Sequence, residues 1–75
     1  MLNKGEAKKI LNLAEDWVKA KEKETIARET LRHINAEEQG AQWLDAFENF
    51  GKALDRADAA RAHFVNFWHS VTERD

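Results

Sequence analysis

Two rows of mostly apolar residues run along nearly the whole chain. Each advances in the alternating three- and four-residue steps of a helix that packs against another helix. The first row is Ile10, Leu13, Trp17, Ala20, Glu24, Ala27, Leu31 and Ile34. The second row is Trp43, Phe47, Phe50, Leu54, Ala57, Arg61, Phe64, Trp68 and Val71. Because the chain contains no proline, this spacing predicts an all-α protein built from two long helices.

The first helix has a clear start signal and a weaker middle. Asn3 followed three residues later by Glu6 matches a capping box, which places the helix start near residue 4. The segment 19–24 is very polar but consists of strong helix formers. We therefore predict one continuous helix over about 4–34, and the alternative is a break near Glu24, which we expect to be exposed.

The turn between the helices has two candidate signals. Asn35 can cap a new helical turn, and Gly40 can instead end the first helix in the left-handed conformation. We predict a turn within 35–41 and a second helix over about 41–72. Gly51 interrupts that second helix and marks either a bend, a close helix contact or a split.

Composition limits the classes of protein. A chain of 75 residues is a single helical domain, 1–75, whose own core supplies only about 3–5 kcal/mol. The absence of cysteine excludes disulfides and thiolate metal sites. With 12 basic and 14 acidic residues, the balance disfavours a dedicated nucleic-acid binder. The sequence shows neither a membrane-length apolar run nor the apolar core of a signal peptide, so we expect a cytoplasmic protein without a membrane segment.

The apolar surface is too wide for an isolated hairpin. The second helix carries a further row, spaced by sevens: Ala46, Ala53, Ala60 and Phe67. The first helix has its own extra row: Ala7, Leu11, Ala14 and Val18. Such width is typical of helix bundles. The sequence therefore predicts a long antiparallel helical hairpin that dimerises into a four-helix bundle. The alternatives are a three-helix bundle monomer and a hairpin completed by a different protein.

Aromatic residues and one arginine are the candidate interface groups. The candidates are Trp17, Trp43, Arg61, Phe64, Phe67 and Trp68. In a hairpin centred near residue 39, Arg61 approaches Trp17 and Asp16. In this position Arg61 determines the register of the helices or the choice of partner. Alternatively, its helix is rotated slightly and the Arg61 side chain extends into water.

No constellation in the sequence points to catalysis or to a cofactor. The chain has no phosphate-binding glycine loop, and its carboxylates are scattered over solvent positions. The three histidines, His33, His63 and His69, lack the spacing of a helical metal site, and we expect them at the surface. We therefore expect a non-enzymatic protein that needs no metal or cofactor.

These features predict a protein–protein interaction module, a small regulator or inhibitor of the kind common in bacteria and phages. One alternative is RNA or DNA binding through the lysines of the first helix: Lys4, Lys8, Lys9, Lys19, Lys21 and Lys23. A second alternative is a nucleic-acid mimic that blocks a DNA-binding protein. Its candidate acidic face is Glu37, Glu38, Asp45, Glu48, Asp55 and Asp58.

Overall fold

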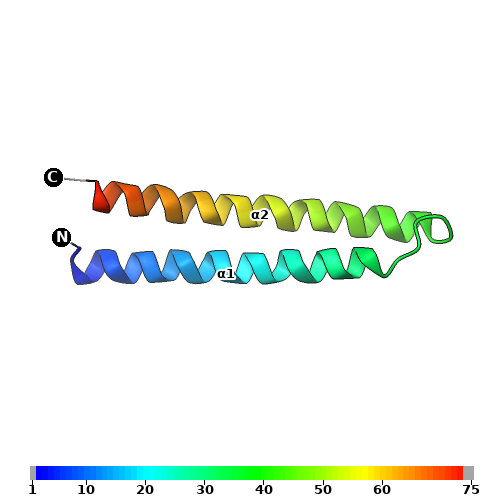
Figure 1. Cartoon of the computed structure of the whole chain (residues 1–75), viewed down its shortest axis with the longest axis horizontal. Coiled ribbons are helices and arrows are strands. Elements are labelled where there is room, and N and C mark those ends of the chain that lie inside the picture. The colour runs from blue at the N-terminus through cyan, green and yellow to red at the C-terminus, as the bar shows by residue number, and fades with distance from the viewer. Residues whose placement is uncertain (1, 74–75) are drawn as a thin grey trace.

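The computed structural model describes residues 2–73, which form two antiparallel helices lying side by side (Figure 1). Helix α1 spans Lys4–Arg32 and helix α2 spans Gly40–Thr72. The start of α1 and the end of α2 lie at one end of the rod, and the connection lies at the other (Figure 1). The predicted all-helical hairpin is confirmed. The three-helix alternative is wrong, because α1 continues unbroken past Glu24.

The hairpin is unusually extended for its length. It measures 58 × 16 × 12 Å, with a Cα radius of gyration of 17.0 Å. A compact domain of this length has a radius of gyration of about 11 Å. Each helix therefore has one neighbour, and most of its circumference faces outward.

The capping box at the start of α1 is confirmed. The backbone N–H of Glu6 donates to Asn3 Oδ1 at 2.8 Å, and the backbone N–H of Asn3 donates to Glu6 Oε1 at 3.2 Å. These two bonds satisfy N–H groups that have no partner inside the helix. They fix where α1 begins.

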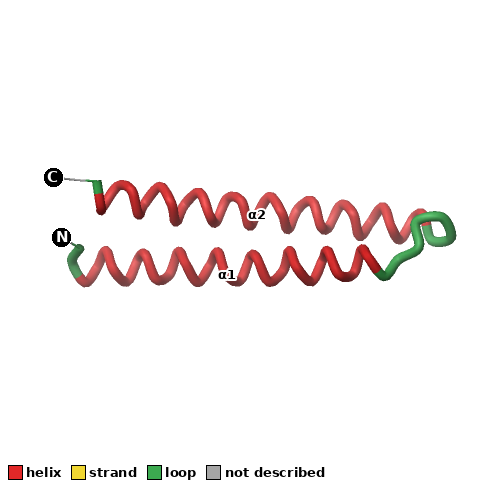
Figure 2. The backbone as a smooth tube through the Cα atoms, viewed as in Figure 1, coloured by secondary structure: helices red, strands yellow, loops and turns green. Residues whose placement is uncertain are grey.

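Residues 33–39 form the connection, the green loop at one end of the rod in Figure 2. Asn35 organises this connection. Its Oδ1 accepts hydrogen bonds from the backbone N–H groups of Glu37 at 2.9 Å and Glu38 at 3.3 Å. Gly40 is the first residue of α2, and no glycine in the described chain has a positive φ. The hypothesis that Gly40 ends the first helix in the left-handed conformation is therefore wrong. α1 ends earlier, with His33 as its C-cap.

The first predicted row faces α2, because each of its members is buried or half-buried. The second predicted row is wrong in four of its nine members. Phe47, Leu54, Arg61 and Trp68 are all exposed. The further row of α2, namely Ala46, Ala53, Ala60 and Phe67, faces α1 in their place. The observed α2 seam is Trp43, Ala46, Phe50, Ala53, Ala57, Ala60, Phe64, Phe67 and Val71.

Small residues in α2 explain this rotation. In an antiparallel pair, each seam residue of one helix lies in a layer with a seam residue of the other. In the observed seams, Trp17 then lies opposite Ala60, and Leu31 lies opposite Ala46. Two contacts between the helices agree with that register. The rings of Trp17 and Phe64 lie 5.7 Å apart, and Lys9 Nζ lies 4.5 Å from the centre of the Phe67 ring. Alanines at the seam let the two backbones approach and leave room for the larger side chains of α1.

Glu24 lies within the interface between the helices. We expected it to be exposed, but only 5% of its surface is accessible. Its Oε2 lies 3.1 Å from Lys21 Nζ, one helical turn earlier, and makes no well-directed hydrogen bond. The expectation failed because the layer opposite Glu24 is Ala53, whose small side chain lets α2 cover the carboxylate.

Gly51 neither bends nor splits α2, which is continuous from Gly40 to Thr72. A Cβ atom added at Gly51 meets no atom within 4 Å. The hypothesis that this glycine permits close contact with α1 is therefore wrong. Within the described chain, Gly51 leaves an open notch on the surface of α2.

Candidate association surface

The exposed large apolar side chains concentrate on one side of the hairpin. The described part of the chain exposes eight of them: Leu2, Leu11, Val18, Ile26, Leu44, Phe47, Leu54 and Trp68. Six of these fall on the surface that we call the apolar face. Its members are Leu11 and Val18 of α1 and Leu44, Phe47, Leu54 and Trp68 of α2.

Helical geometry places these six residues on the same side. In each helix, the positions outside the seam that come one or four residues after a seam residue lie on one side of the seam. In an antiparallel pair, these positions of both helices lie on the same side of the pair. Phe47 and Trp68 each follow a seam residue by four positions, Phe47 after Trp43 and Trp68 after Phe64. Val18 follows the seam residue Trp17 by one position, so it lies on the same side of the seam but farther from it. The two helices therefore both contribute to the apolar face, in which Arg61 and Asp58 separate Leu54 from Trp68.

Phe47 is held in position by its neighbour in the same helix. Its ring stacks on that of Trp43 with centroids 5.3 Å apart and 17° between the planes. Nevertheless, 49% of Phe47 and 42% of Trp68 remain accessible. Aromatic side chains that are ordered yet exposed are the groups most enriched at protein interfaces. They mark both ends of the α2 part of the face.

A positive charge and two negative charges share the outer surface of α2. Arg61 is exposed in the same row as Phe47 and Trp68, and it makes no ion pair within residues 2–73. Glu48 and Asp55 are also exposed, three residues before and four residues after Gly51. Residues at these spacings lie on one side of a helix. The open notch at Gly51 is thus bordered by two carboxylates.

The structure divides the predicted interface residues into two groups. Trp17, Trp43, Phe64 and Phe67 are half-buried in the seam between the helices, whereas Arg61 and Trp68 point outward. Trp17 contacts the ring of Phe64, and within residues 2–73 the one cation–π contact is that of Lys9 with Phe67, so the Arg61 guanidinium does not lie over the Trp17 ring.

The prediction omitted Leu44, which is exposed, and Val65, which is half-buried. Both belong to a row spaced by sevens, namely Leu44, Gly51, Asp58 and Val65. This seven-residue period in the sequence could have identified these two residues as members of the apolar surface.

The opposite side of the hairpin is more polar. Near the turn it carries a groove of about 510 Å³ lined by both helices, with Ile26 and Thr30 from α1 and Asp45 and Asn49 from α2. Nearer the middle, a groove of about 250 Å³ is lined by charged residues and two alanines: Asp16, Lys19, Ala20, Lys23, Ala53 and Arg56. None of the six residues of the apolar face lines either groove, and of the eight exposed large apolar side chains only Ile26 lines one of them.

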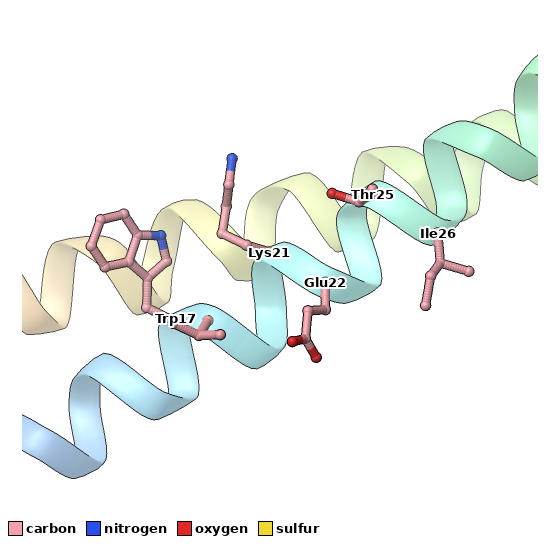
Figure 3. A pocket seen from close by; sticks show the side chains of 6 residues that line it. Trp17, Lys21, Glu22, Thr25 and Ile26 are labelled. Carbon is pink, nitrogen blue, oxygen red and sulfur yellow. The ribbon is translucent and has the colours of Figure 1, made fainter.

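A further groove of about 540 Å³ runs along the outer surface of α1. Figure 3 shows Trp17, Lys21 and Thr25 along one edge and Glu22 and Ile26 along the other, with α2 passing behind. Side chains of one helix alone line this groove. It therefore lacks the convergent groups from several elements that characterise a catalytic site.

The acidic residues proposed as a mimic are spread over three regions. Glu37 and Glu38 lie in the connection, where their backbone N–H groups bind Asn35. Asp45 lines the groove opposite the apolar face. The others, Glu48, Asp55 and Asp58, lie exposed along α2.

The lysines of α1 are similarly divided. Lys19 and Lys23 line the charged groove, Lys21 pairs with Glu24, and Lys9 lies over Phe67. Neither set of charges forms a single uninterrupted surface.

The histidines lie apart at the surface, with His69 Nδ1 positioned 2.7 Å from Glu73 Oε1. Within residues 2–73, no three or more His, Cys, Asp or Glu side chains are grouped so that they could hold a metal ion. Neither described helix is long and apolar enough to cross a membrane. The chain matches no protein-family model, no curated protein and no solved structure.

Proposed function

We propose that this protein is a non-enzymatic helical association module that binds a protein surface through its apolar face. By binding in this way, the protein would act as a small regulator or inhibitor of its partner. The observation that carries the proposal is the concentration of six of the eight exposed large apolar side chains on one side of the hairpin. Exposed large apolar side chains that gather on one side of a folded protein mark interaction sites.

The total surface area supports the proposal. The chain exposes 5924 Å², whereas a compact monomer of its mass exposes about 4,700 Å². The excess is about 1,200 Å², and a typical specific interface removes about 800 Å² from each partner. Burial of the apolar face in a complex therefore accounts for surface that a single hairpin leaves in water.

A capture experiment tests the proposal. Tagged wild-type protein and a Phe47→Ser/Trp68→Ser variant are used to capture proteins from a lysate of the native host, and the bound proteins are identified by mass spectrometry. Untagged copies of this chain count as captured protein. We expect the double variant to lose the proteins that the wild type retains, because both side chains lie on the apolar face.

The matched control is Ile26→Ser, which removes a side chain of 66% exposure on the opposite side of the hairpin. This control should capture the same proteins as the wild type. Circular dichroism must show equal helicity for all three proteins. Capture that is unaffected by the double variant, or is lost equally in the control, contradicts a role for the apolar face.

A further inference from the structure

We infer that the occupant of the apolar face is a second copy of this chain, with α2 packed antiparallel against α2 of the copy. Arg61 of each copy enters the notch at Gly51 of the other. The inference rests on the proposed function, since it names the partner of the same face. It makes the protein a symmetric dimer of hairpins whose turns lie at opposite ends.

Three of the four pairs of layers on the outer surface of α2 are complementary in an antiparallel contact, and the fourth places Leu54 opposite Asp58. It carries two rows, each spaced by sevens and separated by three- and four-residue steps: Leu44, Gly51, Asp58 and Val65 in one, and Phe47, Leu54, Arg61 and Trp68 in the other. In antiparallel packing, residues of one row lie in layers with residues of the other. The two rows of α2 therefore form a second seam that meets its own copy.

The centre of this seam coincides with the centre of the helix. Arg56 is the midpoint of α2, sixteen residues from either end. A two-fold axis there gives full overlap of the two helices and places Leu44 beside Trp68 of the copy. Phe47 then lies beside Val65 of the copy, so that apolar residues meet at both ends of the contact. The layers repeat over 24 residues, about 36 Å of helix.

The same register brings opposite charges together at Gly51. Arg61 lies in the layer of Gly51 of the copy, where an added Cβ atom would meet nothing within 4 Å. The long arginine side chain therefore faces the residue with the most room. Glu48 and Asp55 of the copy lie one turn to either side of that layer, and their carboxylates are placed to receive the guanidinium. Symmetry creates this contact twice in each dimer.

The first test is the mass of the purified full-length protein in solution. Sedimentation equilibrium over a range of concentrations should show conversion of the 8.7 kDa chain to a species of twice that mass. The variant Arg61→Glu should weaken the dimer by about tenfold or more, because it opposes like charges at both contacts. Arg56→Glu is the matched control. It makes the same charge change on the side facing the polar groove and should leave the dimer unchanged.

A charge exchange tests the register itself. The variant Glu48→Arg/Asp55→Arg should also fail to dimerise, since its new positive charges face Arg61. When this variant is mixed with Arg61→Glu, each contact again joins opposite charges, and a mixed dimer should form with affinity near that of the wild type. Failure of the mixture, while each variant alone still dimerises, overturns the predicted pairing.

The outcomes separate this inference from the proposed function. A protein that stays at 8.7 kDa at all concentrations, yet captures a different protein through Phe47 and Trp68, refutes the second copy and supports an association module. A monomer that captures nothing through that face refutes both. A dimer that is insensitive to Arg61→Glu refutes the antiparallel α2 contact.

Discussion

The rings of Trp17 and Phe64 lie 5.7 Å apart and are inclined by 33°, and this contact joins the middle of α1 to the C-terminal half of α2. The sequence suggested instead that Trp17 meets Arg61. The difference is one helical turn along α2 and a rotation that carries Arg61 to the outside. Trp17 consequently packs in the seam of the hairpin, and Arg61 is exposed on the outer surface of α2.

A double-mutant cycle on Trp17 and Phe64 should give a coupling energy of about 1 kcal/mol, as expected for a packed aromatic pair. The free energy of unfolding is measured by urea denaturation for the wild type, both alanine variants and the double variant. A parallel cycle on Trp17 and Arg61 should give a smaller coupling, because the Arg61 side chain is exposed and its guanidinium makes no cation–π contact with Trp17 in the described chain. Coupling to Arg61 as large as that to Phe64 would contradict the observed rotation of α2.

Ala57 should not tolerate a larger side chain. It is only 3% exposed and lies in the seam, opposite Ala20 in the register described above. We expect Ala57→Leu to lower the free energy of unfolding by about 1–3 kcal/mol, because the added atoms force the helices apart. The same substitution at the exposed Ala59 should change the unfolding midpoint in urea very little. Equal tolerance at both positions would show that α2 does not bury this row.

Glu24 should be a stabilising target, although it belongs to an ion pair. Because its carboxylate is buried beside Lys21, exchange for an apolar residue removes the cost of taking a charge out of water. We expect Glu24→Leu to raise the free energy of unfolding by about 1 kcal/mol or more.

Lys21→Ala should have the opposite effect and lower it by about 1 kcal/mol, because it leaves the carboxylate without its partner. Lys8→Ala, at an exposed site, is the control for the loss of a lysine. A lower melting temperature for Glu24→Leu than for Lys21→Ala would disprove the proposed free-energy cost of burying the Glu24 carboxylate.

The start of α2 lacks the capping that fixes the start of α1. Gln39 is its N-cap residue and makes no side-chain hydrogen bond to the helix backbone, and the first turn contains no acidic residue. Gln39→Asp should therefore raise the free energy of unfolding by about 1 kcal/mol through a new cap and a favourable charge at the helix N-terminus. Gln39→Ala provides the comparison without a cap. An aspartate no better than alanine would mean that the connection cannot accept the cap geometry.

At concentrations at which the chain is a monomer, Gly51 should accept alanine with a gain in stability. The residue lies inside a continuous helix, and a Cβ atom there meets nothing within 4 Å. Gly51→Ala should raise the free energy of unfolding by about 1 kcal/mol, the difference in helix propensity. Gly40→Ala, at the end of the helix, should give a smaller gain. Urea unfolding that shows a loss at Gly51 would indicate a constraint on this position that the single hairpin does not contain.

The local features of the fold were determined by the sequence alone. The capping box of Asn3 and Glu6, the extent of two long helices and the seam of α1 follow from hydrogen bonds and periodicity within a few residues along the chain. The existence of an apolar surface beyond the needs of a hairpin also followed from counting rows. None of these features depends on how one helix is rotated against the other.

The rotation of α2 was decided only by tertiary packing. Its apolar arc contains three adjacent rows, and a row of alanines and a row containing Phe47 and Trp68 both fit beside the central one by spacing alone. Hydrophobicity favours the larger residues, but α1 presents bulky side chains such as Trp17, and close approach of the backbones requires small residues opposite them. The alanines therefore turn inward and cover Glu24. Phe47, Arg61 and Trp68 remain exposed on the outer surface of α2, which we propose as the contact with a second copy.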